Sequence, residues 1–164
     1  MRTLFRAVAV LLLAGLSAGS SCSGGGDGDG AAFPGVWQYQ LGSFSFVNCG
    51  FSSTQVPLAR SGFVIADEAG ALVRTNPDGC RFTIVPTTTR HATGVTGEQC
   101  TVTGTDVYGQ PLTTVYTVDT LLLELRPDDG SEMIEVFQVA SVQTSTAGTV
   151  RCELSGNNTL DRGP

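Results

Sequence analysis

The side chains best able to do chemistry in this sequence are its five cysteines. Their thiols can form disulfides, bind a metal ion or accept a covalent modification. No two of them have the CxxC spacing that is typical of zinc sites, so we expect disulfides and no metal or other cofactor. Removing the first, Cys22, leaves an even set, which consists of Cys49, Cys80, Cys100 and Cys152.

Four cysteines allow three disulfide pairings, and the sequence alone leaves the choice open. We favour Cys80–Cys100, which would close the base of a hairpin around residues 87–90. Cys49–Cys152 would then link the first and last strands. Such bonds imply an oxidising compartment, and each would contribute about 2–4 kcal/mol to stability.

Other candidates for chemistry are weak, and we expect no enzyme. His91 is the only histidine, and its position beside a predicted turn favours an exposed loop residue over a catalytic base. The chain has neither a GxSxG nucleophile motif nor an HExxH zinc motif. The acids Asp128, Asp129 and Glu132 could form a weak cation site, but a solvated turn is the better interpretation.

The N-terminus carries a targeting signal. Residues 1–21 combine two arginines, a short apolar run and then small residues, which is the pattern of a secretory signal peptide. The apolar run is shorter than the roughly 20 residues that a membrane-spanning helix needs. We therefore expect export of the remaining chain.

The stretch LSAGSSC, residues 16–22, resembles the cleavage region of bacterial lipoproteins. The resemblance implies acyl chains on Cys22 and a protein anchored in the cell envelope, at the periplasmic or surface face of the outer membrane. Gly19 departs from the aliphatic residue of that pattern, and ordinary cleavage after Ser20 is the alternative, with Cys22 as a thiol. Residues 22–32 include SGGGDGDG, which predicts a flexible tether rather than a calcium loop.

The charge balance limits the partners. The chain has nine basic and fifteen acidic residues, a net charge of −6. Nucleic acid requires clustered positive charge, so we expect no binding to it. Adhesion to an anionic membrane surface is disfavoured for the same reason, and membrane contact would depend on the lipid anchor.

Residues 33–164 are enough for one domain, and their pattern is β throughout. Trp37, Tyr39 and Leu41 alternate with polar residues, and the phase changes at Gly42, which predicts a bulge or bend before Phe44 and Phe46. Further strands are expected at residues 61–66, 71–74, 80–84, 100–106, 112–125, 133–142 and 149–154. Together they predict a single antiparallel up-and-down barrel or a β-sandwich.

The leader, the tether and the motifs GVWQY, NPDGC, GEQC and VRCEL resemble small, β-rich, four-cysteine lipoproteins of myxobacteria. The resemblance implies a binding or structural β domain whose partner is another envelope protein. Gly35-Val36-Trp37 also matches the GxW start of lipocalins, which implies a carrier of a small apolar ligand. Both interpretations remain open at this point.

Overall fold

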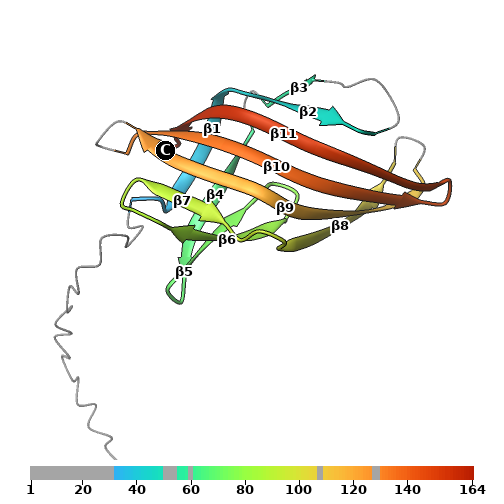
Figure 1. The fold of residues 1–164 in the computed structure, drawn as a ribbon, viewed down its shortest axis with the longest axis horizontal. Coiled ribbons are helices and arrows are strands. Elements are labelled where there is room, and N and C mark those ends of the chain that lie inside the picture. The colour runs from blue at the N-terminus through green and yellow to red at the C-terminus, as the bar shows by residue number, and fades with distance from the viewer. Residues whose placement is uncertain (1–31, 50–54, 59–60, 107–108, 127–129) are drawn as a thin grey trace, which may run out of the picture.

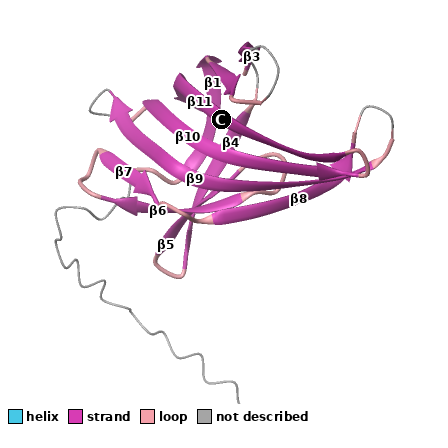
Figure 2. Cartoon of the chain, turned by 45° about the vertical axis from the view of Figure 1, so that its right-hand side comes forward, coloured by secondary structure: helices cyan, strands magenta, loops and turns pink. Residues whose placement is uncertain are grey.

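The computed structural model describes residues 32–49, 55–58, 61–106, 109–126 and 130–164. These residues form an all-β fold in one antiparallel sheet (Figures 1 and 2), which confirms the predicted fold class. The described part of the chain contains no helix of the length and apolarity needed to cross a membrane. The predicted signal peptide, Cys22, residues 22–31 of the tether, and Asp128 and Asp129 lie outside the described residues.

The strands, in chain order, are β1 Gly35–Leu41, β2 Ser43–Val47, β3 Gln55–Pro57, β4 Gly62–Glu68, β5 Ala71–Thr75, β6 Arg81–Pro86, β7 His91–Gly94, β8 Gln99–Thr105, β9 Pro111–Arg126, β10 Glu132–Ser145 and β11 Gly148–Arg162. Hydrogen bonds follow the order β1-β4-β5-β6-β7-β9-β10-β11, and β11 pairs with β1 again. The sheet therefore closes on itself, and we call these strands the ring.

Strands β9, β10 and β11 are longer than the others and continue beyond the ring as a curved extension (Figure 1). There β8 pairs with the first half of β9, and β2 pairs with β11 on the other side. A register shift places Thr120 opposite Gln138 but Val118 opposite Val139, so Asp119 forms a bulge. The bulge lies where β9 changes its neighbour from β8 to β7.

Several turns form where the sequence predicts them. Strands β4 and β5 make a hairpin in which Ala69 and Gly70 have φ values of 55° and 88°, the left-handed conformation that tight hairpin turns require. The Asn76–Gly79 turn follows, with the Gly79 amide donating to the Asn76 carbonyl at 2.9 Å. Strands β6 and β7 pair across residues 87–90, where the sequence predicts a hairpin.

The predicted bend at Gly42 is present. Strand β1 ends at Leu41 and β2 begins at Ser43, and a register shift between Tyr39 and Leu41 adds a bulge against β11. A Cβ atom at Gly42 would lie 2.6 Å from Oδ1 of Asn158. Glycine is required here because the side chain of a neighbouring strand fills the space.

Three strand assignments differ from the sequence-based expectation. Strands β3 and β7 were not expected. His91 is exposed, as expected, but it is the first residue of β7 rather than a loop residue. Strand β11 runs to Arg162 instead of ending at Leu154. Its polar sequence Ser155-Gly156-Asn157-Asn158 has little β propensity, but this part of β11 pairs with β10 on one side and meets the end of β1 and the start of β2 on the other, so tertiary pairing overrides the local preference.

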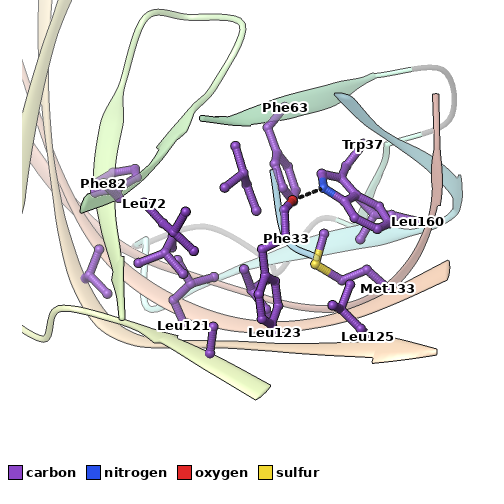
Figure 3. Close-up of a cluster of buried hydrophobic side chains, with 14 of the residues drawn as sticks. Phe33, Trp37, Phe63, Leu72, Phe82, Leu121, Leu123, Leu125, Met133 and Leu160 are labelled. Atoms are coloured by element: carbon purple, nitrogen blue, oxygen red, sulfur yellow. Dashed lines mark hydrogen bonds between the residues drawn. The ribbon is translucent and has the colours of Figure 1, made fainter. Parts of the chain in front are cut away.

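One end of the ring is filled by packed side chains (Figure 3). Phe33, Trp37, Leu125, Met133 and Leu160 are at most 1% exposed there. The indole of Trp37 donates to the Phe33 carbonyl at 2.9 Å, which satisfies its buried N–H. We call this the packed end.

The packed end is also where the described chain begins. Arg162 stacks its guanidinium on the Trp37 ring, with 4.7 Å between guanidinium carbon and ring centroid. The same guanidinium donates to the carbonyls of Ala32, Pro34 and Gly130. Arg162, the last residue of β11, therefore holds residues 32–34 in place at the packed end.

Candidate functional site

The cysteines downstream of Cys22 form two disulfides, Cys49–Cys152 and Cys80–Cys100, which confirms the favoured pairing. The Cα atoms are 4.4 Å apart in the first bond and 5.6 Å in the second. Cys49 follows β2 and Cys152 lies in β11, so the first bond crosses one side of the extension. Cys80 directly precedes β6 and Cys100 lies in β8, so the second bond joins the ring to the other side.

His91 contacts the turn that precedes its strand. Its Nδ1 atom is 3.1 Å from the hydroxyl of Thr88, and the ring is exposed on the outer surface of β7. Glu132 begins β10, after the undescribed residues 127–129. Among the described residues no group of three or more histidine, cysteine, aspartate or glutamate side chains could hold a metal ion.

A cavity of about 330 Å³ lies inside the fold at the opposite end of the ring from the packed end. Its walls are mainly apolar. The aromatic part consists of Phe44, Phe82, Tyr116 and Phe137, and the aliphatic part includes Val118, Leu121, Val139 and Leu154. The bulge at Asp119 contributes directly, because it lets Val118 and Leu121 both face inward although they are three positions apart.

Tyr39 and Arg74 line the floor of the cavity, and Glu135 and Asn158 contact them from behind it; we define these four buried residues as the polar cluster. Arg74 and Glu135 form an ion pair through Nη1 and Oε1. The Tyr39 hydroxyl donates to Oε2 of Glu135 at 2.8 Å, and the Asn158 amide donates to the same oxygen at 3.2 Å. Both carboxylate oxygens therefore have partners, as a fully buried carboxylate requires.

Three further contacts hold Arg74 in place. Its Nε donates to Oδ1 of Asn76 at 2.9 Å. Its guanidinium carbon lies 3.9 Å from the centroid of the Phe63 ring, a cation–π contact. Nη2 also donates to the Tyr39 hydroxyl at 3.3 Å, so every guanidinium nitrogen has a partner.

The electrostatics of the floor keep Tyr39 neutral. Burial raises the pKa of its phenol far above the ordinary value, and the Glu135 carboxylate raises it further against the opposing effect of Arg74. A protonated Tyr39 can go on donating to Glu135. The polar cluster thus carries one positive and one negative charge, which form the Arg74–Glu135 ion pair.

The rim of the cavity is formed by the Asn76–Gly79 turn. Pro77 and Asp78 line the cavity and are exposed, so the cavity reaches solvent beside them. Oδ1 of Asp78 accepts the Cys80 amide at 2.9 Å, and Cys100 is the register partner of Tyr116. The Cys80–Cys100 disulfide therefore ties this turn to the wall on the other side of the cavity. Burial, and then the charge of Asp78, raise the pKa of Tyr116.

The residues of this cluster were not expected to meet. A usable signal existed, because Arg74 follows Leu72 at an inward position of β5, and Glu135 follows Met133 at an inward position of β10. An ionisable residue in the apolar phase of a strand needs a partner of opposite charge. Which residue that partner is depends on the fold.

Comparison with known proteins adds no further constraint. No protein-family model, no curated protein and no solved structure matches this chain. The cavity and its polar cluster therefore carry the functional argument.

Proposed function

We propose that the domain binds a small, largely apolar ligand in the cavity. The observation that carries this proposal is the combination of a cavity of about 330 Å³, aromatic and aliphatic walls, and one polar cluster at the floor. Ligand sites in proteins have volumes of roughly 300–1,000 Å³ and pair apolar walls with a few fixed polar groups. This supports the carrier interpretation that the GxW motif suggests.

The surroundings favour a preformed site. Phe82, Val118 and Leu121 in its walls are at most 5% exposed and belong to the continuous hydrophobic core. The two disulfides fasten the extension on both sides of the cavity. A ligand would therefore lose little free energy to ordering the protein.

The domain would act in the cell envelope, lipid-anchored to the outer membrane through Cys22. The LSAGSSC stretch supports this part of the proposal. Because the described chain enters at the packed end, an anchored domain would be attached at the end opposite to the cavity. Intact mass spectrometry of the processed protein tests the anchor: we expect the mass of a triacylated Cys22 with two disulfides, and the mass of an unmodified thiol would overturn it.

A contact with another envelope protein is the second candidate. It is favoured by an apolar row on the outer surface, where Val85, Leu122 and Val136 are 47%, 46% and 36% exposed. Thr93 connects Val85 to Leu122 in register, and Leu122 pairs with Val136. Cross-linking in cells from a photoreactive residue at position 122 should capture one specific protein, and an absence of products would count against this candidate.

Ligand binding is tested by titrating the processed protein with N-phenyl-1-naphthylamine, an uncharged probe that fluoresces in apolar sites. We expect saturable fluorescence from the wild-type protein. Val139→Trp should fill the cavity and weaken binding by roughly tenfold or more, since its side chain lines the wall.

Val136→Trp is the matched control, because Val136 lies on the same strand but faces outward. It should leave the titration unchanged. No saturable fluorescence in the wild type, or an equal loss in both variants, would contradict binding in the cavity.

A further inference from the structure

We propose that the cavity selects an uncharged ligand, one whose polar end is a neutral hydroxyl or carbonyl group, over a fatty-acid type of anion. This inference rests on the proposed function, because it names the chemistry of the ligand for the same cavity. At first sight the arginine in the floor favours a carboxylate. The contacts of Arg74 indicate the opposite.

The charge of Arg74 is already neutralised within the protein. Its partner Glu135 is 0% exposed, so this carboxylate has no access to water that could replace the ion pair. A ligand carboxylate that drew Arg74 toward itself would leave Glu135 as an uncompensated buried charge. The cost of such a charge exceeds what one new ion pair returns.

The position of Arg74 is also fixed. Asn76, Glu135 and Tyr39 each engage a different nitrogen of the guanidinium, and the Phe63 ring covers one of its faces. A guanidinium has five N–H donors, and these contacts use three of them. Within the described residues, Arg74 thus has spare donors for a neutral oxygen acceptor, without any movement of its charge.

The remaining charged group of the cavity lining is negative. Asp78 lies in the rim and is exposed, and it forms no ion pair within the described part of the chain; its Oδ1 accepts the Cys80 amide. The lining residues together with Glu135 therefore comprise one cation and two anions. An anionic ligand would enter past Asp78 and be buried without a counterion, whereas a neutral ligand meets neither penalty.

The experiment is displacement of N-phenyl-1-naphthylamine by 1-decanol and by decanoate, which have equal chain lengths and differ in charge at about pH 8. We expect decanol to displace the probe at roughly tenfold lower concentration than decanoate. Equal or better displacement by decanoate overturns the inference and leaves the proposed function intact. A wild-type protein that fails to bind the probe contradicts the proposed function itself.

Two variants test the electrostatic reason. Glu135→Gln leaves the charge of Arg74 without its internal counterion. The ligand preference of this variant should therefore shift toward decanoate by roughly tenfold. If this variant does not fold, Asp78→Asn decides, since asparagine retains the Oδ1 acceptor for Cys80. Asp78→Asn should improve displacement by decanoate several-fold and leave that by decanol unchanged.

Asp67→Asn is the matched control for Asp78→Asn. Asp67 is also an exposed aspartate whose Oδ1 accepts a turn amide, from Gly70 at 2.8 Å, but it lies near the end of β4, beside the β4–β5 turn, and does not line the cavity. This variant should change neither displacement curve. An equal effect of both substitutions would show that overall charge, and not the rim, sets the preference, and this would overturn the inference.

Discussion

The Arg74 guanidinium and the Glu135 carboxylate form an ion pair inside the ring, with side-chain exposures of 9% and 0%. They belong to β5 and β10, strands that are not neighbours in the sheet, so the pair spans the interior. Tyr39 and Asn158 complete the hydrogen bonding of the carboxylate. This pair sets both the polarity of the cavity floor and a large part of the sensitivity of the fold to mutation.

Breaking the ion pair from one side should destabilise the protein strongly. Arg74→Met leaves Glu135 buried without a counterion, and we expect a loss of about 3–5 kcal/mol in unfolding free energy. The double variant Arg74→Met/Glu135→Leu removes both charges and should recover most of this loss. Urea denaturation of the wild type, Arg74→Met and the double variant measures the unfolding free energy of each. A double variant as unstable as Arg74→Met would contradict this account.

Stability should fall as the pH rises above about 10. The pKa of Tyr39 is raised in the folded protein from an ordinary value of 10.0, so in this range the unfolded chain releases a proton that the folded protein retains. The Tyr39 contribution is therefore fully present below pH 10 and is lost above it. In Tyr39→Phe the decline of unfolding free energy between about pH 9 and 11 should be shallower.

The pKa of Tyr116 is also raised, so the same measurement on Tyr116→Phe separates the contributions of the two phenols to the pH dependence of stability. An unchanged slope in Tyr39→Phe, measured by denaturation at each pH, would contradict the assigned role of Tyr39.

The two disulfides should differ in their contribution to stability. They close loops with sequence separations of 103 and 20 residues. The loop-entropy relation then gives about 5 kcal/mol for Cys49–Cys152 and about 3 kcal/mol for Cys80–Cys100. Denaturation of the paired alanine variants Cys49→Ala/Cys152→Ala and Cys80→Ala/Cys100→Ala should show this order, and the reverse order would count against it.

Gly42 should not tolerate a side chain. A Cβ atom there would lie 2.6 Å from Oδ1 of Asn158, whose amide is part of the polar cluster and whose Oδ1 accepts the Ser43 amide at 3.0 Å. We expect Gly42→Ala to lower the melting temperature, at a cost of about 1–3 kcal/mol. Gly104→Ala is the control, because a Cβ atom there meets nothing within 4 Å. Equal effects of the two substitutions would refute the steric explanation.

Much of the β structure could be predicted because its signals are local. The alternation of Cys80, Phe82 and Ile84 with polar residues indicates which side chains are buried, and all three are at most 5% exposed. The turn at residues 76–79 and the phase change at Gly42 depend on residues with special backbone preferences. The favoured pairing of Cys80 with Cys100 followed from the hairpin expected around residues 87–90.

The candidate site could not be predicted in the same way. Its cluster joins Tyr39, Arg74, Glu135 and Asn158, which lie on four strands spread across the chain. Asn158 was outside every expected strand, because β11 was expected to end at Leu154. Nothing in the local pattern of that polar segment indicates that it pairs on both sides.

The sequence by itself determined the β class, the positions of most turns and the side of the sheet to which many residues point. Alternation with a period of two is a property of the single strand, so it can be read without knowing the neighbours. Only the tertiary structure decided that β11 pairs with β1 to close the ring, and that Arg74 meets Glu135 beside a cavity. Backbone hydrogen bonds are the same for every residue type, so strand neighbours are selected by the packing of the whole interior.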